Sequence, residues 1–97
     1  MGIESSTAVQ QEVIIVDVHE RVLSGDTTEL LKRALASISG DIRIVIDLSN
    51  VVELGDDALR VLFDSRRRIF AIKGATDQNV RAKFSKSTTS AVFRFLP

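Results

Sequence analysis

The sequence predicts a single α/β domain in which helices flank a mixed β-sheet of about four strands. Two apolar runs rich in β-branched residues, Val13–Val16 and Ile42–Leu48, are typical of sheet strands. Segments of helical periodicity follow both runs, which favours a layered α/β arrangement. The chain has 97 residues, the length of one domain.

The first strand is predicted at Glu12–Val18, and residues 1–11 are expected to be a flexible lead-in to a domain that spans residues 12–97. Asp26 is expected to begin the first helix by accepting hydrogen bonds from free backbone amides, and Gly40 is expected to end it. Apolar residues at helical spacing predict one buried stripe on this helix. The stripe consists of Leu30, Leu31, Ala34, Leu35 and Ile38.

The second strand is predicted at Ile42–Leu48, followed by a loop over Ser49–Gly55. Asp56 or Asp57 is expected to cap a second helix. The core stripe of that helix is expected at Leu59, Leu62 and Phe63, with Ile69 as a further candidate. Arg66–Arg68 fall near its end, where cations complement the helix dipole. The later elements are a strand at Ile69–Ile72, a helix at Gln78–Ser85 with Val80 and Phe84 inward, and a terminal strand within Ala91–Leu96.

Composition narrows the classes of function. The chain has no cysteine, which excludes disulfides, thiolate metal sites and a cysteine nucleophile. His19 is the only histidine, and the sequence contains none of the usual hydrolase, zinc or nucleotide-binding motifs. No apolar run approaches the roughly 18 residues of a membrane span. We therefore expect a cytoplasmic protein that is not an enzyme and carries no cofactor or metal.

Charge is balanced in number but separated along the chain. Residues 1–57 contain 11 acidic and 4 basic residues, whereas residues 58–97 contain 9 basic and 2 acidic ones. Such a separation can orient a protein partner, or it can reflect two solvated faces. Nucleic-acid binding is not expected, because Tyr and Trp are absent and the five phenylalanines occupy core-like spacings.

The stretch Ile44–Leu62, IVIDLSNVVELGDDALRVL, resembles the STAS domain, the fold of bacterial anti-sigma factor antagonists. Residues 47–49 (Asp-Leu-Ser) match the family's strand end, and residues 55–59 (GDDAL) take the positions of its Asp-Ser-Ser/Thr-Gly-Leu motif. Downstream, Asn79–Phe84 is similar to the family's Val-Lys-X-Leu-Phe helix, and Val92–Phe95 to the strand that follows. The resemblance spans residues 12–95.

Several departures mark the chain as a divergent or minimal member. The family's phosphorylatable serine falls on Asp56, and Ala58 replaces the glycine of the motif. Glu20–Leu23 stands where the family has a Gly-X-Leu-Asp turn. The segment between the central helix and the next strand is shorter than usual, and the usual last helix is missing after Pro97.

The resemblance implies docking to an anti-sigma factor that is also a GHKL-type kinase. Asp56 could act as a fixed stand-in for phosphoserine, although one charge and two planar oxygens mimic phosphate only in part. It could equally serve only to cap the helix. The contact residues implied are Glu53, Leu54, Asp56, Asp57, Ala58, Arg60 and Val61.

Two other readings stay open. Small STAS subunits brace the ATPase of bacterial phospholipid ABC transport complexes, and a short chain without the last helix suits this role. A hydrolase or metal-dependent enzyme would use the acidic loop, in which Glu53, Asp56 and Asp57 supply oxygen ligands. The loop lacks a recognised metal-binding spacing, which favours the docking roles over the enzyme.

Overall fold

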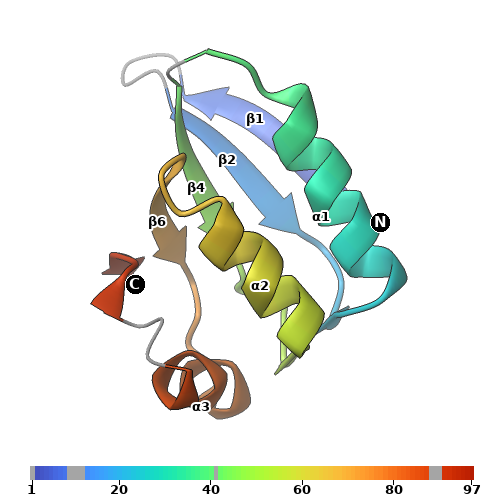
Figure 1. Cartoon of the computed structure of the whole chain (residues 1–97), viewed down its shortest axis with the longest axis vertical. Coiled ribbons are helices and arrows are strands. Elements are labelled where there is room, and N and C mark those ends of the chain that lie inside the picture. The colour runs from blue at the N-terminus through green and yellow to red at the C-terminus, as the bar shows by residue number, and fades with distance from the viewer. Residues whose placement is uncertain (1, 9–12, 41, 88–90) are drawn as a thin grey trace.

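The computed structural model describes residues 2–8, 13–40, 42–87 and 91–97. Within them, a five-stranded mixed sheet is accompanied by three helices (Figure 1). The predicted α/β class is confirmed. The sheet has one strand more than expected, because residues near the N-terminus join it.

The main sheet has the strand order β1-β2-β4-β6-β7. Its strands are β1 (Ile3–Ala8), β2 (Val13–Val18), β4 (Arg43–Asp47), β6 (Ile69–Lys73) and β7 (Phe95–Leu96). β1 is antiparallel to β2, whereas β2, β4, β6 and β7 run parallel. The carboxyl ends of β2, β4 and β6 therefore lie at one edge of the sheet, and each leads into a helix that begins there.

A second, very short sheet joins two of the loops at this edge. It pairs β3 (Val22–Leu23) with β5 (Glu53–Leu54) in parallel. The Gly55 amide donates a hydrogen bond to the Leu23 carbonyl at 2.9 Å. The loops that precede the first two helices are thus fixed to each other, although about 30 residues separate them in sequence.

Helices α1 (Asp26–Ser37) and α2 (Asp56–Asp64) lie over the same face of the sheet (Figure 1). α3 (Gln78–Lys86) lies beyond the carboxyl ends of the strands. Its first turn is capped by the Asp77 carboxylate, which accepts a hydrogen bond from the Asn79 amide at 2.8 Å.

The main core fills the space between α1, α2 and the sheet. Leu31 and Leu62 from the helices are fully buried with Ile44 and Ile46 from the central strand. Phe84 of α3 extends this core and contacts two C-terminal rings, Phe93 and Phe95, edge to face. Val80 is also buried, so both inward positions predicted for the third helix are confirmed.

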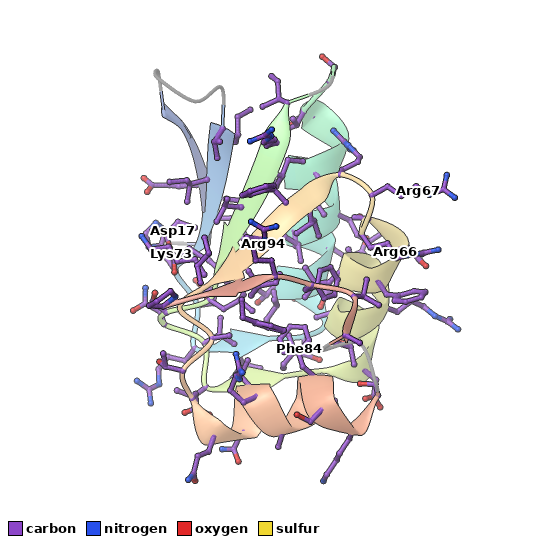
Figure 2. The ribbon with its side chains drawn as sticks, turned by 90° about the vertical axis from the view of Figure 1, so that its left-hand side faces the viewer. Asp17, Arg66, Arg67, Lys73, Phe84 and Arg94 are labelled. Carbon is purple, nitrogen blue, oxygen red and sulfur yellow. The ribbon has the colours of Figure 1, made fainter. Side chains whose placement is uncertain are left out.

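The other face of the sheet carries a smaller apolar cluster of Val13, Val45 and Ala71. None of the helices among the described residues covers this side, and Asp17 and Lys73 lie on it, away from α1 and α2 (Figure 2). We call this side, centred on Val13, Val45 and Ala71, the open face.

The prediction that residues 1–11 form a flexible lead-in is wrong for Ile3–Ala8, because these residues form β1. Its backbone pairs with β2 from Ile3 opposite Val18 to Ala8 opposite Val13. The sequence IESSTA has little apolar alternation, so its composition gave no strand signal. An edge strand needs only one neighbour, and here the continuous apolar run of β2 provides it.

The predicted helix caps are wrong at α1 and α2. The N-cap residues are Gly25 and Gly55, neither of which has a side-chain cap, so Asp26 and Asp56 are already the first helical residues. The predicted stripes are also too wide: Leu30 is 41% exposed and Phe63 37%. Each lies at the margin of its helix's buried face, where the sheet no longer covers it.

The arginines after α2 serve two helices. Arg66 Nη1 donates to the Phe63 carbonyl at 3.1 Å, at the end of α2 as expected. Arg68 instead reaches the end of α1, where its guanidinium donates to the Leu35 carbonyl at 2.9 Å and to the Ile38 carbonyl. α1 has no basic residue in its own last turn, so Arg68 supplies the cation that its dipole favours.

Candidate functional site

The predicted docking loop lies at the carboxyl edge of the parallel strands, where α2 begins. Leu54 is 4% exposed and anchors β5 in the core, while Glu53 beside it is exposed. Gly55 then allows close packing, because a Cβ there would lie 2.4 Å from Ser24 Oγ and 2.5 Å from Asp57 Oδ1. The loop is therefore pressed against the turn that opens α1.

Asp57 ties the beginnings of α1 and α2 together. One carboxylate oxygen accepts a hydrogen bond from the Gly25 amide at 2.8 Å, and the other accepts one from Ser24 Oγ at 3.1 Å. Gly25 is the N-cap residue of α1 and has φ 59°, which favours glycine. The α1 cap that the sequence assigned to Asp26 is thus supplied from α2, across the helix pair.

These contacts change the acidity of Asp57. The Gly25 amide lowers the pKa of this carboxyl below its ordinary value of 3.8, against a smaller opposing effect of desolvation. The Ala58 amide and the hydroxyls of Thr28 and Ser24 lower it further. Hydrogen bonds to the charged form stabilise it, so Asp57 is a fixed negative charge at neutral pH.

Asp56 is arranged differently from its neighbour. Its side chain is 90% exposed, and its Oδ1 atom lies 2.6 Å from Nζ of Lys83 on α3. An exposed ion pair of this kind contributes little to stability. It does hold the carboxylate at the outer corner of the loop, where another molecule can reach it. Of the two carboxylates, Asp57 is committed to internal bonds and Asp56 is presented.

The remaining predicted contact residues divide into two groups. Arg60 is exposed and Val61 half-buried, on the outer side of α2. Ala58 is fully buried, and Leu54 nearly so. Neither Leu54 nor Ala58 presents its side chain to a partner in this conformation. Both side chains are packed beneath the loop surface and support the exposed residues.

A groove of about 440 Å³ runs between α1 and α2 beside the loop. Its α2 side contains four of the predicted residues: Asp56, Asp57, Arg60 and Val61. Its α1 side contains Thr28, Glu29 and Lys32, which sequence reasoning missed. A sequence pattern could have indicated two of them, because Glu29 and Lys32 lie three residues apart on the charged side of α1, beside its buried stripe. In the structure they form an ion pair at 3.5 Å.

The loop does not gather its carboxylates around one point. Among residues 2–8, 13–40, 42–87 and 91–97, no group of three His, Cys, Asp or Glu side chains is placed to hold a metal ion. The His19 side chain contacts other carboxylates, with its Nε2 atom 2.8 Å from Glu4 Oε1 and 3.9 Å from Asp17 Oδ2. No described helix is both long and apolar enough to cross a bilayer.

Comparison with protein-family models and with curated proteins finds no match. Solved structures do match. A crystal structure of an anti-sigma factor antagonist from Mycobacterium paratuberculosis is similar with a TM-score of 0.81 and 21% identity, covering 99% of this chain and 86% of that one. A candidate anti-sigma factor antagonist from Thermotoga maritima gives 0.79 and 15%, covering 98% and 86%. The chain therefore has the fold of these anti-sigma factor antagonists, the STAS fold that the sequence predicts.

Proposed function

We propose that this chain is a cytoplasmic regulator of the anti-sigma factor antagonist type, which acts by docking to a protein and catalyses no reaction. The partner proposed is an anti-sigma factor or a related GHKL-type kinase. The whole-chain likeness to two structures of this class supports the proposal, although at 21% and 15% identity it establishes the fold alone. The function is therefore argued from the site.

The observation that carries the proposal is the presentation of Asp56. This carboxylate is exposed at the first turn of α2, held by Lys83 and unused by the core. We assign it to the position at which the related proteins carry a phosphorylated serine. A carboxylate there keeps a permanent negative charge at the docking surface. This charge weakens or strengthens partner binding, as a phosphate would, without phosphorylation by a kinase.

Glu53, Arg60 and Val61 complete the surface proposed to touch the partner, with Leu54, Asp57 and Ala58 supporting it from within. The support matters for affinity, since a loop that is already ordered loses little freedom on binding. The paired strands β3 and β5 and the Asp57 hydrogen bonds provide that order.

The test compares Asp56→Ser with the wild type against each purified GHKL-type anti-sigma kinase of the source genome. Isothermal titration would give affinities, and incubation with labelled ATP would give phosphate uptake. We expect Asp56→Ser to change the affinity at least about fivefold or to accept phosphate. Asp26→Ser is the matched control, because Asp26 is an exposed carboxylate at the first position of α1.

The outcomes separate the parts of the proposal. Unchanged affinity with no phosphate uptake removes the phosphoserine-like role of Asp56 and leaves docking intact. If no such kinase binds either protein, the anti-sigma assignment is wrong. A complex with an ABC-transporter ATPase in its place would point to the transport role.

A further inference from the structure

A cluster of arginines around one phenylalanine lies at the opposite end of the strands from the docking loop. Phe70 is 36% exposed on β6. The Arg43 guanidinium lies 5.0 Å from the centre of its ring, and the Arg94 guanidinium lies 5.1 Å from it. Arg43 comes from β4 and Arg94 from the residue before β7, the two strands on either side of β6. We call Phe70, Arg43 and Arg94 the Phe70 cluster.

A β-bulge places this ring. The register between β4 and β6 pairs Ile44 with Ile69 and then Val45 with Ala71, so Phe70 has no partner. The extra residue lets Ile69 remain in the main core while Ala71 joins the open face. Bulges redirect side chains in this way and are common beside functional sites.

Among the residues that the structure describes, no carboxylate neutralises either guanidinium, because neither Arg43 nor Arg94 forms an ion pair with one. Both are exposed. A cavity of about 280 Å³ adjoins the ring and is lined by Gly40, Ile42, Arg43, Arg67, Arg68 and Phe70. The apolar open face begins on the other side of the ring, at Val45 and Ala71.

We propose that the Phe70 cluster binds an extended acidic segment of a partner protein. Each guanidinium offers a planar fork that matches a carboxylate. The two forks come from the strands on either side of β6, so a segment that lies across Phe70 can meet both. Side chains on one face of an extended strand recur about every 6.6 Å, so a single acidic segment can present a carboxylate to each fork. Intervening apolar side chains would lie on the open face.

Nucleic acid fits the cluster less well. Binding of single strands relies on bases stacking upon free aromatic faces. Here the guanidiniums already lie over the Phe70 ring. The proposal does not depend on the anti-sigma assignment, because Arg43 and Phe70 lie at the beginnings of β4 and β6, whereas the docking loop follows the end of β4. If both surfaces bind, the domain joins two proteins at once.

The experiment uses the full chain and a labelled peptide, Gly-Glu-Ser-Glu-Ser-Glu-Gly, with fluorescence anisotropy as the readout. We expect saturable binding that weakens with added salt. The Arg43→Ala/Arg94→Ala double variant should bind about tenfold more weakly or worse, since charge-assisted hydrogen bonds are lost. Arg94→Lys keeps the charge without the fork and should bind with intermediate affinity.

Arg66→Ala is the matched control. Arg66 also lies over an exposed ring, with its guanidinium 4.3 Å from the centre of Phe63, but on the helix side of the molecule (Figure 2). It should bind within about twofold of the wild type. Circular dichroism melts would show that all variants are folded.

Four results would overturn the proposal. They are no saturable binding by the wild type, an equal loss in Arg66→Ala, equal binding of a peptide with Gln in place of Glu, and displacement by inorganic phosphate at matched ionic strength. Tighter binding of single-stranded RNA than of the peptide would likewise replace it with a nucleic-acid site.

Discussion

Asp57 shows how a side chain of one helix can take the place of the conventional cap of another. Helices α1 and α2 both begin with an N-cap glycine that has no side chain to offer. The Asp57 carboxylate accepts hydrogen bonds from Gly25 and Ser24, and so it neutralises part of the positive end of α1 while belonging to α2. Residue 55 must be glycine for Ser24 and Asp57 to come this close, since a Cβ at this position would clash with Ser24 Oγ and Asp57 Oδ1.

The first prediction concerns the pH dependence of this link. Asp57→Asn should lower the free energy of unfolding by about 0.5–1 kcal/mol at pH 6, at the low end of the capping range because the side chain is exposed. The pKa of Asp57 is lower in the folded protein than its ordinary value. Its stabilisation is therefore fully present above the unfolded pKa of about 3.9 and is lost as the pH falls through the folded pKa.

Urea titrations between pH 6 and pH 2.5 would measure this effect. The difference between wild type and Asp57→Asn should shrink toward the acidic end. Asp56→Asn removes a charge from the adjacent position, which accepts no backbone hydrogen bond among the described residues, and should change stability less. A difference that stays constant with pH, or that is equal for the two variants, would contradict the assigned role.

The elements are held together by contacts that cross between them. Arg68 is the clearest case, because it follows α2 in sequence and caps the carbonyl end of α1. Lys83 of α3 similarly reaches the first turn of α2. A single basic side chain thus links α2 to α1 near its carboxyl end and another links it to α3 at its amino end, in addition to the apolar core that the helices share.

The second prediction follows from the Arg68 cap. Arg68→Ala leaves two carbonyls at the end of α1 without their charged donor, which should cost about 1.5–3 kcal/mol of unfolding free energy. Arg67→Ala removes an adjacent exposed arginine that makes no ion pair among the described residues, and should cost less than about 0.5 kcal/mol. Guanidinium chloride unfolding of both variants would measure the difference, and equal costs would argue against the cap.

Most of the elements could be predicted from the sequence, because their signals are local. The strands β2, β4 and β6 contain contiguous apolar residues, so their limits were placed to within one residue, and α3 was placed as closely. The helix ends were placed less well: α1 ends at Ser37, before Gly40, and α2 ends at Asp64, before the arginines expected near its end. β3 and β5 are only two residues long, too short for any periodic pattern. Their pairing depends on two loops meeting in space, which no local pattern reveals.

The candidate site was predictable to the same extent. The acidic loop and the start of α2 were found by their motif, but the different uses of Asp56 and Asp57 were not. That difference depends on Ser24 and Gly25, which lie 33 and 32 residues from Asp57 in sequence, and on Lys83, which lies 27 residues from Asp56. The burial of Ala58 was equally hidden, since it follows from α2 packing against the sheet.

At the scale of the whole molecule, the helices of the described residues cover one side of the sheet and leave the open face without a helix (Figure 2). Edge strand β1 shields the apolar strand β2 along its full length. An exposed edge beside a Val-Ile-Ile-Val run is a template for pairing with another chain. We therefore assign β1 a protective role that its polar composition alone does not suggest.

The third prediction tests that role by removing residues 1–8. The shortened protein should self-associate at concentrations at which the full chain stays monodisperse, as measured by light scattering during size-exclusion chromatography. Adding Ile15→Lys to the shortened chain places a charge beside the exposed edge and should reduce the association. Monodisperse behaviour of the shortened chain would show that β1 is dispensable for solubility.

The β3–β5 pair has one further consequence. Because it already joins the two loops in the free protein, binding of a partner at Asp56 does not require either loop to become ordered. The heat capacity change on complex formation should then match the apolar area covered at the contact, with no added contribution from ordering the chain. Association would also proceed as a rigid-body encounter, with its rate governed by diffusion and orientation.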